Sequence, residues 1–490
     1  MNESATNAAE PSGSRKLGAR QSFPRSSPYW PVISHRLLRR VLPGMAVSSF
    51  GDGMSVVAIS WFALELAPAG SEAAWVALAV AAYSLPATVG AAVFGRFLAG
   101  RGSAQLVYWD ATLRGVTLAL IPVAYLTGLL NPTIFVVLLA VSSLLHSWGV
   151  AGRFTLIAEV LPERQHVPAN ALLNIFAGAA TIAGPPVAGL LIGWQGAALV
   201  IALDAVSFLA LAVSYLFALR AGVADKPAEA PPKNRGAGLR AVAGDRTLLV
   251  LMLLTFAFFA FFGPVYVAFP IYVNDIGGSA ALLGLYYTVF GVGSLIGAVA
   301  SGYAGRLPLW RTITGIILGF GVTLLPLGLG APVPVSLAAF ALGGFIWAPY
   351  MALSRALIQR RAEPGRLASV LAANTALIIP AVPLGTIAGG PLVTLLGARG
   401  TLLCCAIATI ALGLLAVVFL ALAAPEDGPA GAGGGHQATD DTPPDGGLRD
   451  TDQAREERSH PQDGEPAAEI GEDEQATPDG DRTQVPSRHP

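Results

Sequence analysis

Twelve long apolar stretches divide this chain, and each is long enough to cross a lipid bilayer as a helix. A hydrocarbon core of about 30 Å needs roughly 20 apolar residues in helical conformation. Strands of a membrane barrel would be shorter and would alternate in polarity, which these stretches do not. The sequence therefore predicts an all-α integral membrane protein. We place its spans at approximately 41–64, 75–95, 105–127, 132–152, 169–192, 197–219, 247–269, 281–304, 312–330, 334–354, 368–392 and 401–422.

The composition excludes a soluble globular protein. Apolar residues make up 53% of the chain and charged residues only 12%, whereas a water-exposed surface needs far more charge. Residues 425–490 hold 17 acidic and 5 basic residues, so the rest of the chain carries a net charge of +11. Cys404 and Cys405 are adjacent inside an apolar stretch, a spacing that suits neither a disulfide framework nor a metal site. We interpret them as packing residues and expect neither a bound metal nor a cofactor.

The two halves of the chain repeat one plan, which predicts internal duplication. Three landmarks recur with nearly the same period. The aligned pairs are Arg153, Pro162 and Arg164 with Arg355, Pro364 and Arg366 (offset 202), residues 98–101 with 303–306 (offset 205), and Gly184-Pro185 with Gly390-Pro391 (offset 206).

This repeat predicts two bundles of six helices, at 37–220 and 247–423. A linker rich in Pro, Ala, Lys and Arg joins them at 221–246. Residues 1–36 form a polar tail. Residues 424–490 contain almost no large apolar side chains, so they cannot bury enough surface to offset their chain entropy, and we expect them to be disordered.

Basic residues predict the orientation, because they accumulate on the cytoplasmic loops of membrane proteins. Lys and Arg fall on alternate connections, at 96–101, 153–164, 220–246, 306–311 and 355–366, and Arg399 is the exception. The tails and the linker are therefore expected in the cytoplasm, and the protein in the plasma membrane.

This arrangement resembles the major facilitator superfamily of secondary transporters over roughly residues 36–423. After its second helix that family carries the pattern G-x-x-x-D-R-x-G-R-R. Gly95, Arg101 and Gly102 stand near that register here, with Ala99 in place of the Asp. The resemblance implies a gate on the cytoplasmic loops, and the residues of this gate would be Gly95, Arg101, Arg153, Arg306 and Arg355. The alternative is that the arginines only fix the orientation of the protein in the membrane.

The fifth stretch resembles proton-coupled exporters of the family, which carry G-x8-G-x3-G-P-x2-G-G there. Gly184, Pro185 and Gly189 match, and alanines occupy the other three positions, 171, 180 and 188. The segments 48–52 and 203–208 are similar to the macrolide-efflux and siderophore-export branch. The alternative is that the small residues only let neighbouring helices approach closely.

Ionisable residues inside a membrane are costly, which makes them functional candidates. Asp52, Asp204 and His146 are candidates for proton coupling or substrate contact. The structural alternatives are backbone capping, a hydrogen bond to a neighbouring helix, and a satisfied core histidine. Asp110 and Arg114 are one helical turn apart, the spacing at which opposite charges pair, and we expect a structural pair.

Aromatic side chains cluster in the seventh and eighth stretches. Rings supply large apolar contact surfaces and negative faces for cations. If they face a pocket, the cargo is bulky and amphipathic; if they face lipid or the bundle, they only pack. The candidate pocket residues are Phe258, Phe262, Tyr266, Tyr286 and Tyr287.

Together these features predict a secondary exporter that is not an enzyme. Its small-molecule substrate would bind near the bilayer midplane, and the two bundles would expose the site alternately to each side. The resemblance to proton-coupled exporters implies that a proton gradient supplies the energy. No phosphate-binding loop of the pattern G-x-x-x-x-G-K-S/T is present, which argues against direct drive by ATP. We expect a monomer that binds no nucleic acid. The alternatives are an importer or uniporter of a small metabolite, and a membrane receptor or structural partner.

Overall fold

The computed structural model describes residues 27, 29–98, 100–220, 240, 242–304, 308–362 and 366–422. The predicted C-terminal tail and Arg306 lie outside this part of the chain, as do most of the predicted N-terminal tail and linker. Throughout the described residues the regular secondary structure is helical.

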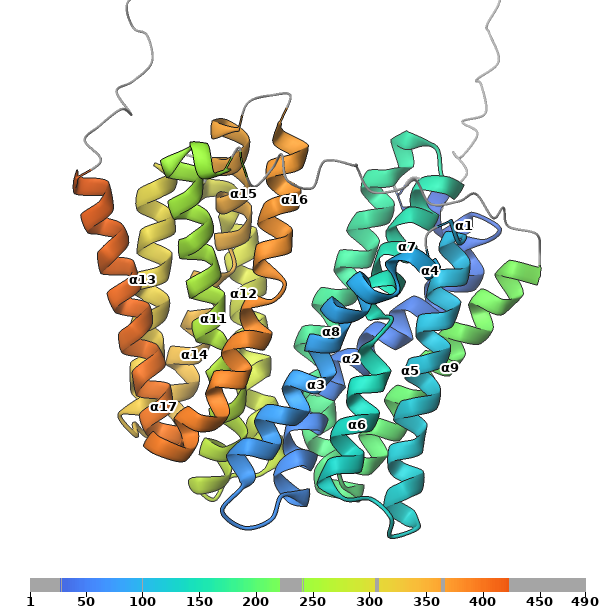
Figure 1. Cartoon of the computed structure of the whole chain (residues 1–490), viewed down its shortest axis with the longest axis horizontal. Helices are drawn as coiled ribbons and strands as arrows, with labels where there is room; N and C mark the ends of the chain where they lie inside the picture. Colours follow the sequence, from blue (N-terminus) through green and yellow to red (C-terminus); the bar gives the residue numbers. More distant parts are fainter. Residues whose placement is uncertain are drawn as a thin grey trace, which may run out of the picture. The chain divides into compact units, whose positions relative to one another are not determined.

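The first half of the chain forms helices that run back and forth between two ends (Figure 1). The short α1 precedes the first long apolar stretch. The helices are α1 (Trp30–Ser34), α2 (Leu38–Leu66), α3 (Glu72–Val93), α4 (Gly95–Leu98), α5 (Ser103–Leu126), α6 (Pro132–Ser143), α7 (His146–Val160), the 3-10 turn η2 (Glu163–Gln165), α8 (His166–Gln195) and α9 (Ala197–Arg220).

The second half forms a corresponding set, drawn in green to red in Figure 1. It comprises α11 (Arg246–Asp275), α12 (Ala280–Ala304), α13 (Leu309–Gly328), α14 (Val333–Trp347), α15 (Tyr350–Arg361), α16 (Leu367–Ile378) and α17 (Ala381–Leu422).

The number of spans agrees with the prediction. Within the described residues, 11 helical segments are long and apolar enough to cross a membrane. The last of these contains two spans, because the chain reverses at Gly397, where φ is 70° and ψ is 172°. A side chain disfavours that left-handed conformation, so glycine suits the turn. The predicted fold class, an all-α membrane protein with twelve spans, is confirmed.

The duplication is visible in the helix breaks and in the packing. The fourth span is interrupted between Ser143 and His146, and the tenth between Trp347 and Tyr350, 204 residues later. Helix pairs correspond as well. In the first half α2 packs against α8 and α5 against α9; in the second α11 and α13 both pack against α17, on either side of its bend.

Glycines bring helix backbones together within each half. A β-carbon at Gly184 on α8 would lie 2.5 Å from the carbonyl carbon of Gly53 on α2, and one at Gly53 would lie 2.3 Å from the oxygen of Ala180. In the same way, a β-carbon at Gly385 on α17 would lie 1.9 Å from the backbone oxygen of Ala260 on α11. Lipid offers no hydrophobic drive for helix association, so this close packing must hold the bundles together.

The two halves touch through α8 with α12 and through α3 with α17. These pairs are related by the duplication, since they join the fifth span to the eighth and the second to the eleventh. Gly189 lies against Ala280 and Ala281, and Gly390 against Ala77. These contacts lie toward the ends of the helices away from the linker.

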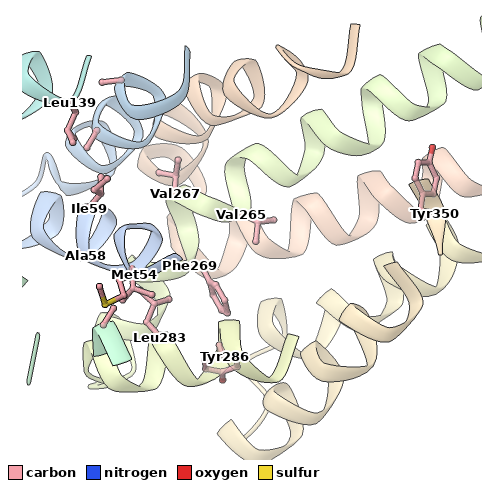
Figure 2. Packing of buried hydrophobic residues seen from close by; sticks show 14 of the residues in the cluster. Met54, Ala58, Ile59, Leu139, Val265, Val267, Phe269, Leu283, Tyr286 and Tyr350 are labelled. Atoms are coloured by element: carbon pink, nitrogen blue, oxygen red, sulfur yellow. The ribbon is translucent and has the colours of Figure 1, made fainter. Parts of the chain in front are cut away.

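Buried apolar side chains of both halves form one continuous cluster. Figure 2 shows part of it, with Met54 and Ala58 from α2 near Leu283 and Tyr286 from α12. Chain segments more than 200 residues apart therefore share a core.

The glycine contact between α2 and α8 leads to a first prediction. Gly184→Val should lower the unfolding midpoint in detergent, because overpacking a tight contact costs about 1–3 kcal/mol. Gly178→Val is the matched control on the same helix, since a side chain there meets open space. Fluorescence-detected size-exclusion chromatography after heating measures both variants. Equal midpoints would contradict the proposed packing role.

Candidate functional site

An ion pair crosses the interior of the first half. Arg114 on α5 donates from Nη2 to Oδ1 of Asp52 on α2, at 3.0 Å. The Arg114 side chain is 1% exposed and that of Asp52 is 31% exposed. A buried guanidinium needs such a partner, because the desolvation of an unpaired charge is very costly.

Three further side chains complete the surroundings of Arg114. Tyr83 on α3 donates its hydroxyl hydrogen to Asp52 Oδ1 at 2.8 Å, and Nη2 of Arg114 donates to the same hydroxyl. Arg114 Nη1 lies 2.6 Å from Nδ1 of His146 on α7, so the neutral imidazole accepts there. The guanidinium also lies 4.4 Å from the ring centre of Phe208. Four helices thus hold one cation.

The predicted partner of Arg114 requires correction. Arg114 pairs with Asp52 on another helix, and not with Asp110 one turn before it on α5. The Asp110 side chain faces α7, where a β-carbon at Gly149 would lie 1.9 Å from its Oδ2. Its two oxygens have no hydrogen-bond partner, and Nδ1 of the neutral His146 lies 3.9 Å from Oδ2. Tertiary packing therefore overrides the local spacing.

Asp204 on α9 lies in a separate buried position next to α2. Ser55 donates to its Oδ2 at 2.5 Å, and Ser207 Oγ lies 3.2 Å from its Oδ1. A β-carbon at Gly51 would come within 2.2 Å of Oδ1, so the glycine provides the room that the carboxyl occupies.

A cavity of about 230 Å³ opens between the two halves beside this cluster. Tyr83 belongs to both, since it lines the cavity and donates to Asp52. The lining combines hydroxyl groups with aliphatic side chains. It consists of Ser55, Val56, Ile59, Ser60, Val80, Tyr83, Ser84, Tyr266, Tyr287, Val382 and Thr386.

The structure separates the predicted pocket aromatics. Tyr266 and Tyr287 line the cavity, and Phe262 packs edge-on against Tyr266 with ring centres 5.0 Å apart. Phe258 and Tyr286 are buried within the second half, against Tyr350 and beside Ser336 respectively. For these two residues the packing alternative is correct, because both side chains are buried against residues of the second half and neither lines the cavity.

The predicted loop residues do not all lie beside the buried cluster of Asp52, Tyr83, Arg114 and His146. Arg101 is exposed and lies over the ring of Trp109 at 5.3 Å, and Arg355 is exposed on α15. Gly95 lies near Trp148. Arg153 is half-buried on α7, with Nε and Nη2 shielded from solvent and without a hydrogen-bond partner. The gate they were predicted to form stays a prediction.

Sequence reasoning missed Tyr83 and Ser55, which connect the carboxylates to the cavity. Tyr83 is the one tyrosine in the second stretch, and that isolation was an available signal. Ser55 follows Asp52 by three residues, a spacing that places both on neighbouring parts of one helix surface.

A double-mutant cycle tests the ion pair. Arg114→Ala and Asp52→Ala should each lower stability by about 3–5 kcal/mol, because each leaves a charge without its partner. The double variant should be less destabilised than the sum of the two. Thermal unfolding in detergent measures all three proteins, and strict additivity would argue against coupling between the side chains.

Residues 41–378 match the family model described as Major Facilitator Superfamily. A relative named multidrug efflux pump Tap, from Mycobacterium tuberculosis, is 27% identical over 400 residues, covering 78% of this chain and 93% of the relative. Its namesake from Mycolicibacterium fortuitum is 26% identical over 378 residues, covering 75% and 91%.

Solved structures share the fold at low sequence identity. A bacterial homologue of the iron transporter ferroportin, solved in an inward-facing state, is 18% identical, with a TM-score of 0.62; the match covers 80% of this chain and 99% of that one. The nucleoside transporter NupG is 12% identical, with a TM-score of 0.61, and the match covers 77% and 99%.

Proposed function

This chain belongs to the Major Facilitator Superfamily, and we propose that it exports amphipathic small molecules in exchange for protons. It is a multi-pass membrane transporter and not an enzyme. Alternating access explains why two duplicated bundles enclose one site, since each orientation opens the site to one side only.

The observation that carries the proposal is the double role of Tyr83. Tyr83 lines the cavity, and its hydroxyl bonds to Asp52, which in turn pairs with Arg114. A substrate in the cavity would contact Tyr83 directly. Any shift of this hydroxyl would change the hydrogen bonding of this charge pair, so substrate binding would act on the ionisable groups of the first half.

The cavity lining supports an amphipathic cargo. Aliphatic side chains and the rings of Tyr266 and Tyr287 offer apolar contact, while Ser60, Ser84 and Thr386 offer hydroxyls. Among the described residues, none that lines the cavity carries a charge. The relatives named as multidrug efflux pumps support the same direction and cargo class.

A proton gradient would drive the cycle without a bound cofactor, and one chain would suffice, because both halves of the cavity come from the same chain. We place the protein in the plasma membrane with the linker end of the bundles in the cytoplasm, where the basic connections predict it.

Drug accumulation tests the exporter. Cells that make the protein should accumulate less of some members of a panel of amphipathic drugs than cells without it. A protonophore should remove the difference, and so should Asp52→Asn, which removes the charge opposite Arg114. Unchanged accumulation of every compound would refute export, and full activity of the Asp52 variant would exclude that residue from the mechanism.

Ethidium efflux tests the cavity. Tyr266→Leu and Tyr287→Leu should each raise the apparent KM for this aromatic cation about two- to tenfold, the loss expected when one aromatic contact is removed. Phe261→Leu is the matched control, since Phe261 lies on α11 with Tyr266 but is not among the residues that line the cavity. Equal KM values for all three variants would argue against binding at this place.

Cysteine labelling tests the orientation. In a background with Cys404→Ala and Cys405→Ala, a membrane-impermeant maleimide should label Leu129→Cys in intact cells, but not Arg164→Cys. The two positions are exposed at opposite ends of the helices. The reverse pattern would place the linker end outside the cell.

A further inference from the structure

We infer that Asp204, and not the ion-paired Asp52, holds the transported proton, and that Ser55 passes it between Asp204 and the cavity. This inference rests on the proton-coupled export proposed above, and it assigns separate roles to the two carboxyl groups.

The first argument is the absence of a counter-ion. Asp204 is fully buried, and within the described part of the chain no basic side chain lies within ion-pairing distance of it. The charged groups that face it are Asp52 on α2 and Arg114 on α5, and Arg114 is already paired. The third helix packed against α9 is α8, whose one titratable residue is His166 at its first position. Burying an ionised carboxylate without a counter-ion has a high desolvation cost, whereas a protonated, hydrogen-bonded carboxyl group avoids that cost.

The second argument comes from counting hydrogens. Ser207 has one hydroxyl hydrogen, and its oxygen lies 2.7 Å from the backbone oxygen of Asp204 but 3.2 Å from Oδ1. If the carboxyl is ionised, this hydrogen must serve two acceptors. If Oδ1 carries a proton, it donates to Ser207, Ser207 donates to the backbone oxygen, and Ser55 donates to Oδ2. Every polar atom is then satisfied, as buried groups require.

The route for the proton is short. Ser55 lines the cavity and donates to Asp204 Oδ2 at 2.5 Å, so one hydroxyl separates the carboxyl from the space that substrate would occupy. Gly51 closes the opposite side, because α2 backbone lies directly against Oδ1. For release, the protonated oxygen of Asp204 turns to Ser55, which accepts this proton while its own hydrogen passes to water in the cavity. Asp204 then becomes an anion next to the cavity. A cationic amphipath would then neutralise it, and proton and cargo would alternate.

Infrared spectroscopy of the purified protein tests the protonation. At neutral pH the wild type should show the C=O stretch of a protonated carboxyl that Asp204→Asn lacks. Asp275→Asn is the matched control, an exposed carboxyl at the end of α11, and should keep the band. An identical band in Asp204→Asn, or none in the wild type, would overturn the inference.

Proteoliposomes with ethidium as the probe test the coupling. The wild type should concentrate ethidium in response to a pH gradient, about tenfold per pH unit for one-for-one exchange. Asp204→Asn, which mimics the neutral carboxyl, should keep downhill ethidium flux and lose the response to the gradient. If the variant responds like the wild type, the inference fails and proton-coupled export stands. If the wild type itself ignores the gradient, both fail.

Ser55→Ala gives a second, independent test that keeps the carboxyl in place. It should retain the infrared band at a shifted frequency, because the band's hydrogen-bond donor is removed, and it should slow gradient-driven uptake more than downhill flux. An unshifted band with equal effects on both fluxes would overturn the relay through Ser55.

Discussion

Close contact between helix backbones is the constraint on which the buried charges of this protein depend. Glycines at three places on α2 and α7 leave space that carboxyl groups or neighbouring backbone fill: Gly51 for Asp204, Gly53 for Ala180 and Gly149 for Asp110. In lipid such contacts replace the hydrophobic drive for helix association. The same packing that joins the helices therefore also shields their ionisable groups.

The buried groups form a connected arrangement next to the cavity. Arg114 lies at its centre, bonded to Asp52, Tyr83 and His146 from three other helices. Because a buried cation without partners is strongly destabilising, any event that moves one partner must be compensated by another. Tyr83 brings this sensitivity to the cavity wall, where a substrate would bind.

The sequence predicted much of the fold and part of the site. Span positions followed from apolar length, and the duplication followed from aligned pairs such as Arg153 and Arg355. Asp52, His146 and Arg114 were selected because charge is rare in apolar stretches, and the structure brings them together. The partner of Arg114 was predicted wrongly, because spacing along one helix carries no information about which residue of another helix comes closer. Phe258 and Tyr286 failed as pocket residues for the same reason, since a ring-rich helix gives no sign of which side faces a cavity.

The sequence by itself determined the class of protein, the number of spans and the repeat, because these depend on hydropathy and spacing along the chain. Only the tertiary structure decided that Asp52 pairs with a cation, that Asp204 has none among the described residues, and that Ser55 and Tyr83 connect both carboxyl groups to one cavity. The physical reason is that the state of a buried charge depends on atoms a few ångströms away, and these atoms come from helices distant in sequence.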